Sequence, residues 1–157
     1  MPYRFSVFLF ALSAVFTISG CAGSNLGRGL DCLDQKNYSA AISEFDSAAT
    51  IRQHPQIYFG YFQAYMGIND YENAIKYLTV GLAEFPNDAW INLCAGHWYM
   101  QRGNNSRKAL YYYEKAGALR FGNPTNTMYN SINEYIGLAK VKIIADSLES
   151  ESIEKPK

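Results

Sequence analysis

The feature that most constrains the fold is a packing pattern that recurs three times along the chain. In each occurrence a small residue is followed four positions later by a large one and seven positions later by another small one. These nine repeat-packing positions are Ala41, Phe45 and Ala48, then Ala74, Leu78 and Gly81, then Ala109, Tyr113 and Ala116. Residues three and four apart share one face of a helix. Each occurrence therefore predicts a closely packed helix, and the spacing of 33 and 35 residues between the first alanines predicts stacked helical units.

Prolines punctuate the same period. Pro55 and Pro86 close the first two units, and Pro124 follows the third. A small–large–small helix face with a proline at the end of the unit is similar to the tetratricopeptide repeat. The resemblance implies an all-α fold, a solenoid of three antiparallel helix pairs over residues 26–122, with units at about 22–54, 55–87 and 88–122. In this family a small side chain lets the two helices of a unit cross closely. The proline ends one unit and starts the next, where its missing backbone N–H would have had no partner in the helix.

The first helix of each unit fits the family less well than the second. Gly29 and Gly96 match a small position, but Phe62 stands there in the second unit, and Cys32 replaces an aromatic residue in the first. We expect the first helices at about 25–35, 56–68 and 88–102. The second helices are expected at about 38–52, 71–84 and 106–120.

A seventh helix is predicted at about 126–147, from apolar residues at helical spacing. These residues are Met128, Ile132, Tyr135, Ile136, Ala139, Ile143 and Ile144. We expect this helix to cap the solenoid, with Lys140, Lys142 and Asp146 on its outer side. The first half of a fourth repeat is the alternative. Residues 148–157 are charged and are expected to be disordered.

The first twenty residues resemble a secretory signal, with Arg4 as their one charge and an apolar run over 7–16. The run is short for a membrane-spanning helix. Ile18, Ser19, Gly20 and Cys21 are similar to the lipobox of bacterial lipoproteins. This resemblance implies that residues 1–20 are removed, that the Cys21 thiol receives a diacylglycerol, and that 21–25 form a lipidated tether. An ordinary secretory signal or an uncleaved anchor is the alternative.

The residue after Cys21 bears on location. In lipoproteins an aspartate at that position often retains the protein in the inner membrane, and here it is Ala22. The resemblance therefore favours a cell-envelope protein anchored to the outer membrane and facing the periplasm, over one in the inner membrane.

The first helices of such arrays line a concave face. The family's groove positions, carried over to this chain, are Leu26, Leu30, Leu33, Phe59, Gln63, Met66, Trp90, Leu93, His97 and Met100. This surface is apolar and aromatic, and its methionines can adapt to a ligand. It lacks the lysines and asparagines with which co-chaperone repeats clamp a terminal carboxylate. The expected ligand is an amphipathic helix or an apolar extended segment. The alternative is that these side chains pack against the cap or one another.

Three consecutive tyrosines, Tyr111 to Tyr113, span about 200° of a helix and cannot all face the core. Tyr113 is a repeat-packing residue, so at least one of Tyr111 and Tyr112 is expected to be partly exposed. The alternatives for that tyrosine are an interface and a half-buried position against the neighbouring cap helix.

Little in the sequence points to chemistry. Cys32 and Cys94 fall two units apart, roughly 20 Å at the ~10 Å spacing of packed helices, whereas a disulfide needs Cα atoms within about 7 Å. His54 and His97 have no acidic residue at ligand spacing, so no metal site is expected. With 14 basic and 14 acidic residues the chain lacks the charge of a nucleic-acid binder. We predict no catalytic residues and no cofactor besides the lipid on Cys21.

These features together predict a membrane-anchored scaffold that binds a protein or peptide in the envelope, as an adaptor or assembly factor. The alternative is a self-associating structural protein or an accessory subunit of a secretion- or pilus-type machine, and homo-oligomerisation stays open. Likeness at the level of fold does not choose between them.

Overall fold

The structure is a computed structural model that describes residues 24–119 and 127–153, with side chains placed for 24–119 and 131–150. All of the regular structure within these ranges is helical. The helices are α1 (Asn25–Asp34), α2 (Tyr38–Ala49), α3 (Pro55–Gly67), α4 (Tyr71–Glu84), α5 (Ala89–Gln101), α6 (Ser106–Leu119) and α7 (Thr127–Ile153). The predicted all-α fold is confirmed, and the bounds of the first six helices lie within three residues of those expected.

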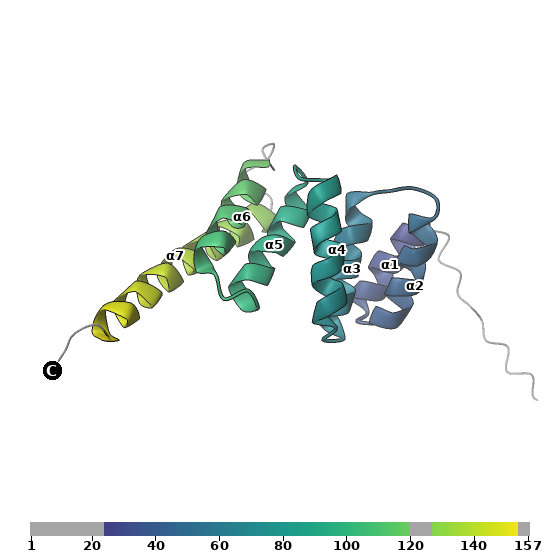
Figure 1. Cartoon of the computed structure of the whole chain (residues 1–157). Helices are drawn as coiled ribbons and strands as arrows, with labels where there is room; N and C mark the ends of the chain where they lie inside the picture. The colour runs from purple at the N-terminus through teal and green to yellow at the C-terminus, as the bar shows by residue number, and fades with distance from the viewer. Residues whose placement is uncertain (1–23, 120–126, 154–157) are drawn as a thin grey trace, which may run out of the picture.

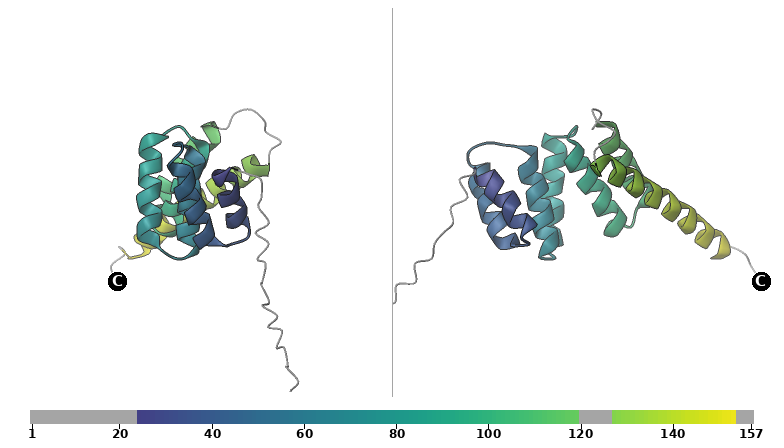
Figure 2. Two further views of the ribbon diagram at one scale, coloured as in Figure 1. Left: turned by 90° about the vertical axis from the view of Figure 1, so that its right-hand side faces the viewer. Right: turned by 180° about the vertical axis from the view of Figure 1, so that it is seen from behind.

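The helices form hairpins that stack in chain order. Helices α1 and α2, α3 and α4, and α5 and α6 pack as pairs, and α7 packs against α6 (Figure 1). The first helices of successive pairs, α1, α3 and α5, also contact one another and form one row. The α1–α2 pair and α7 lie at opposite ends of the array, and α7 extends well beyond its neighbours (Figure 2).

The turn inside each pair follows the same period as the packing pattern. Each contains one residue in the left-handed region, Lys36 (φ 58°), Asn69 (φ 61°) or Asn104 (φ 40°). The next helix is then capped by Asn37, Asp70 or Asn105, whose side chain accepts a hydrogen bond from the backbone N–H three residues later. Such caps satisfy donors that have no partner within the helix. The repeat is therefore encoded in its turns as well as in its packing face.

All nine repeat-packing positions are buried. Phe45 is fully buried, and a Cβ added at Gly29 or at Gly60 would collide with its ring. The ring thus lies between the first helix of its own unit and that of the next. Tyr113 lies against Gly96 in the same way.

The middle unit reverses the sizes. Phe62 stands where the other units have glycine, and Leu78 stands where they have an aromatic ring. Both are buried in the same cluster. Phe62, which does not fit the family pattern, is therefore larger than its counterparts where Leu78 on the partner helix is smaller. A close-packed interior tolerates such a change when the total side-chain volume is kept.

Aromatic side chains connect successive units. The Tyr61 hydroxyl on α3 donates a hydrogen bond of 2.6 Å to Asp46 on α2. Tyr61 also stacks on Tyr77 of α4, with ring centroids 4.2 Å apart. Farther along, the Arg102 guanidinium lies 3.6 Å from the ring centroid of Tyr71. The units are therefore held together by polar and stacking contacts in addition to their apolar core.

Both ends of the array differ from expectation. The segment expected as a tether up to residue 25 ends earlier, because the Ser24 hydroxyl accepts a hydrogen bond from the Gly27 N–H and α1 begins at Asn25. Residues 148–153 were expected to be disordered, but they continue α7. Their glutamates are good helix formers, and Leu148 lies seven residues after Val141, which continues the apolar spacing of the helix. No helix in the described ranges is long and apolar enough to cross a membrane.

The outer side of α7 also differs from expectation. Ile132 and Ala139 are buried as predicted, but Ile144, which was expected on the packed face, is 59% exposed. Lys140 forms an ion pair with Glu114 of α6, and the Asp146 carboxylate accepts a hydrogen bond from Ser106. These charges therefore border the packed face. The residues that face outward include Leu138, Val141 and Leu148.

Candidate protein-binding groove

Two open cavities lie along the row of first helices. The larger, about 570 Å³, is lined from α1, α3 and α5, and the smaller, about 300 Å³, from α3, α5 and α7. Both are lined by Phe59, Phe62, Gln63 and His97. The two cavities therefore adjoin and form one groove across the array. We refer to them as the α1 side and the α7 side of the groove.

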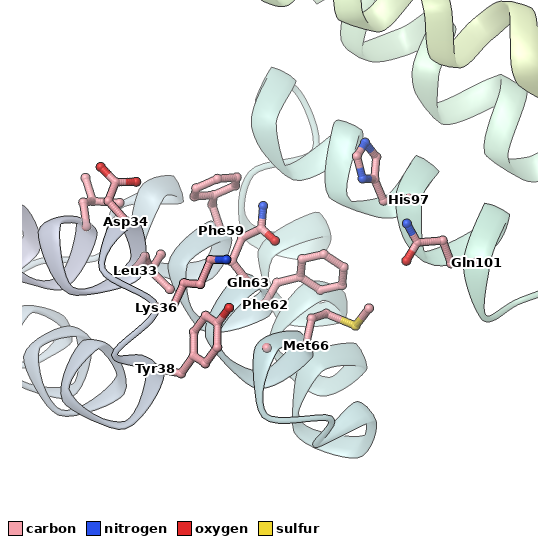
Figure 3. Close-up of a pocket in the computed structure, with 12 residues that line it drawn as sticks. Leu33, Asp34, Lys36, Tyr38, Phe59, Phe62, Gln63, Met66, His97 and Gln101 are labelled. Atoms are coloured by element: carbon pink, nitrogen blue, oxygen red, sulfur yellow. The ribbon is translucent and has the colours of Figure 1, made fainter.

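The α1 side has an apolar floor with polar groups at its edge (Figure 3). Leu30 and Leu33 line it from α1, and Met66 from α3. Gln63 and Gln101 are both exposed in the groove. Their amides offer hydrogen bonds to a bound backbone without imposing a net charge.

The α7 side is more aromatic. Trp90 lies against Phe59 with ring centroids 5.2 Å apart. Leu93 lines the same cavity, while Ser131 and Tyr135 close it from α7. Tryptophan and phenylalanine in a concave site supply large contact areas for an apolar ligand.

The residues expected in the groove mostly line it. Those lining one or both cavities are Leu30, Leu33, Phe59, Gln63, Met66, Trp90, Leu93 and His97. Met100 lines neither cavity and packs in the cluster between α5, α6 and α7. For this residue the alternative of packing against the cap is correct. Leu26 lines a separate cavity beside Ile51 and Ile57.

Phe62 is the main residue of the groove that the sequence did not point to. It lines both cavities and is 3% exposed. By its repeat position it belongs to the packing between helices. Its ring packs in the same cluster as Leu78, which is smaller than the aromatic residue of the other units, and it also lines the groove. The signal available in the sequence was the pair of size changes at 62 and 78 taken together.

His97 occupies the centre of the groove and has an unusual environment. Its ring lies edge-on to Tyr113 and Tyr135, at centroid distances of 5.6 and 4.5 Å. Its Nε2 atom is buried and has no hydrogen-bond partner. Burial lowers the pKa of the His97 imidazole from its ordinary value, because no charge compensates for lost hydration. The imidazole therefore binds its second proton less readily than in water.

The charges on the groove are few and balanced. Asp34 and Lys36 both line the α1 side, and both are exposed. Lys36 is the only lysine among the residues that line the two cavities, so they contain no cluster that could clamp a carboxylate. Such a surface favours a neutral, largely apolar ligand.

Potential chemistry elsewhere is equally sparse. Cys32 on α1 is half-buried, and Cys94 on α5 is buried. Burial raises the pKa of the Cys94 thiol far above its usual range, which makes it a poor nucleophile. No group of three His, Cys, Asp or Glu side chains suited to a metal occurs in the described ranges.

The tyrosine run on α6 divides as expected. Tyr113 is buried, Tyr111 is 58% exposed, and Tyr112 is half-buried, stacked on Tyr99 of α5 with centroids 5.5 Å apart. Tyr112 therefore packs against α5 and not against the cap helix, which was the alternative from the sequence.

Cys21 and the proposed signal at 1–20 lie outside the described residues. The same is true of Pro124 and residues 154–157, and the side chain of Met128 is not described either.

The comparisons with known proteins agree with this geometry. Residues 33–96 match the family model described as Tetratricopeptide repeat, from the end of α1 to the middle of α5. No curated protein matches the chain. Members of this repeat family are typically non-catalytic scaffolds for protein–protein interaction. The chain thus has an all-α helical-repeat fold, and its residues 33–96 are similar to the tetratricopeptide repeat.

Proposed function

We propose that this protein is a scaffold that holds an apolar segment of a partner protein in the groove of α1, α3 and α5. The observation that carries the proposal is the shared lining of the two cavities by Phe59, Phe62, Gln63 and His97. A groove that crosses three helix pairs can hold an extended peptide or an amphipathic helix. An isolated pocket could hold only one side chain.

The chemistry of the lining favours a neutral ligand. Aromatic and aliphatic side chains form the floor, and the exposed amides of Gln63 and Gln101 lie at positions where they can bond a peptide backbone. The single Asp34 and Lys36 at the edge leave no net charge there. We therefore expect binding to depend weakly on salt concentration, since ionic attraction contributes little.

We further propose that the scaffold is anchored to a membrane through lipid on Cys21, at the periplasmic face of the outer membrane. The lipobox-like residues 18–21 support this. Helix α1 begins at Asn25, so only three residues would separate the lipidated cysteine from the folded array. Metabolic labelling with a palmitate analogue should mark the chain, and Cys21→Ala should remove the label. A labelled Cys21→Ala variant would refute the anchor and leave the groove untouched.

The groove is tested by cross-linking in cells that express the whole chain. A photo-reactive amino acid at Gln101, which is exposed in the groove, should form adducts with a partner polypeptide. Gln63→Arg should reduce those adducts at least tenfold, because the longer cationic side chain occupies the point shared by both cavities. Ser43→Arg adds the same side chain to an exposed position on α2 and should have no effect. Equal yields from the two variants would contradict the proposed site.

The alternative function is that of a self-associating or accessory subunit, in which the groove is filled by another copy of this chain. In that case the adducts at Gln101 would have twice the mass of the chain itself. Mass spectrometry of the adducts distinguishes these two functions directly.

A further inference from the structure

The outward face of α7 carries a row of apolar side chains unrelated to the groove. Leu138 is 52% exposed, Val141 66%, and Leu148 61%, with the exposed Ala145 between the last two. Ile144 borders the row and is 59% exposed. We call the set of Leu138, Val141, Ala145 and Leu148 the α7 stripe. No described residue covers it.

The geometry of the stripe is that of a helix-packing seam. Its members follow at intervals of three, four and three residues, which keeps them within an arc of about 80° at 100° per residue. Alternating intervals of three and four are the spacing by which two helices pack along their length. Ile132 and Ala139, which attach α7 to the array, lie on roughly the opposite side and are fully buried. Helix α7 is thus apolar on two faces.

The charges beside the stripe are ordered along the helix. Lys142 borders its earlier part and Glu149 its later part, and the exposed Glu134 precedes it by about one turn. Lys142 and Glu149 are two helical turns apart and border the same edge of the stripe. A parallel pairing of two such helices would place like charges side by side. An antiparallel pairing centred near Ala145 would place Lys142 of each copy beside Glu149 of the other.

We propose that the α7 stripe binds the α7 stripe of a second copy of this chain, antiparallel and about a two-fold axis near Ala145. The pairing buries Val141 of each copy against Leu148 of the other and matches opposite charges twice, as a two-fold interface requires. The small side chain of Ala145 lets the two helices approach at the axis. The two arrays then lie on opposite sides of the helix pair, because the stripe faces away from α6.

The size of the contact sets the expected strength. One helix pair buries less than the roughly 1,200 Å² at the lower end of stable interfaces. The dimer should therefore dissociate on dilution. The ion pair between Lys142 and Asp146 within one helix, at 3.3 Å, is exposed and can be exchanged at small cost.

The first test uses charge variants of the whole chain, expressed together with two different tags. Lys142→Glu places two glutamates at each contact of a dimer, and Glu149→Lys places two lysines there. Each variant alone should lose self-association at least tenfold by co-purification. The two expressed together should associate at wild-type level or better, because each restores the opposite charge that the other needs.

The second test fixes the orientation with single cysteines and a short bis-maleimide in intact cells. Ala145→Cys should cross-link to itself. Val141→Cys and Leu148→Cys should cross-link poorly alone and well when expressed together, since the antiparallel pairing places 141 beside 148 of the other copy. Ile51→Cys, at a residue 78% exposed on α2's side of the array, controls for random collision, and the unsubstituted chain controls for its own cysteines.

Three results would overturn the proposal. One is that each charge variant, expressed alone, self-associates as strongly as the wild type does. Another is efficient self-cross-linking of Val141→Cys and Leu148→Cys, which would mean a parallel pair. The third is adducts at Ala145→Cys with a different protein only. Circular dichroism of each variant shows that helix content is kept, so that a loss of pairing is not a loss of folding.

Discussion

At the scale of single residues, the array is held by the match between glycines on one helix and aromatic rings on another. The Phe45 ring fits against Gly29 of α1 and Gly60 of α3, and Tyr113 fits against Gly96. Glycine in a helix costs about 1 kcal/mol relative to alanine. These positions therefore lower the intrinsic stability of their helices but let an aromatic ring of a neighbouring helix approach the backbone. Phe45 is fully buried, so no part of its ring faces solvent.

This arrangement makes Gly60 a sensitive position. Gly60→Ala should lower the free energy of unfolding by about 2 kcal/mol through overpacking against Phe45. Adding Phe45→Leu, the residue type that the middle unit has at this position, should recover part of the loss. The two changes should therefore be coupled by about 1 kcal/mol in a double-mutant cycle.

Urea denaturation of the four proteins in the cycle measures this coupling. Gly27→Ala is a suitable control, because its added Cβ would meet only the Ser24 hydroxyl, at an ordinary 3.6 Å. Strict additivity of the two substitutions would show that the ring does not limit Gly60.

At the scale of elements, α7 is the helix whose role the sequence left most open. It closes the groove through Tyr135 and Ser131, attaches to α6 through Ile132, and exposes the α7 stripe on its other side. Its contact with α5 passes through His97, whose ring lies between Tyr113 and Tyr135. The junction of α5, α6 and α7 therefore contains a titratable group without a charged partner in ring contact with it.

That junction should be sensitive to pH. Burial lowers the folded-state pKa of His97 below its ordinary value of 6.5, so the unfolded chain binds this proton first. Stability should accordingly be complete above about pH 6.5 and fall as the pH is lowered toward the folded-state pKa. His97→Phe keeps an aromatic ring in place and should reduce this fall between pH 7.5 and 5.5. Thermal unfolding across that range measures it, and parallel curves for the two proteins would contradict the assignment.

At the scale of the whole molecule, the groove and the α7 stripe occupy different sides of the array. Tyr135 faces the groove, whereas Val141 is 66% exposed on the outer side of the same helix. Gln63→Arg should therefore abolish partner cross-linking and leave pairing of α7 intact, and Val141→Glu should do the reverse. Combining them should give the sum of the two losses, because distant sites without shared contacts act independently. A joint loss from either single variant would mean that one surface serves both purposes.

The sequence alone was sufficient to locate the first six helices. The packing face recurs at Ala41, Ala74 and Ala109, and it located all three second helices because helix formation and burial of one face depend on residues close in the chain. The same register placed most of the groove, from Leu30 to His97, since side chains on one face of a helix keep their spacing wherever the helix lies.

Other features required the tertiary structure, because they depend on residues far apart in the chain. The lining role of Phe62 depends on the size of Leu78, and the position of Gly60 depends on Phe45 of the preceding unit. The side of α7 that faces outward depends on where α6 lies, so Ile144 is exposed where it was expected to be packed, and Lys140 borders the packed face through its ion pair with Glu114. Periodicity shows which residues share a helix face. Only the packed neighbours decide which of two apolar faces is buried.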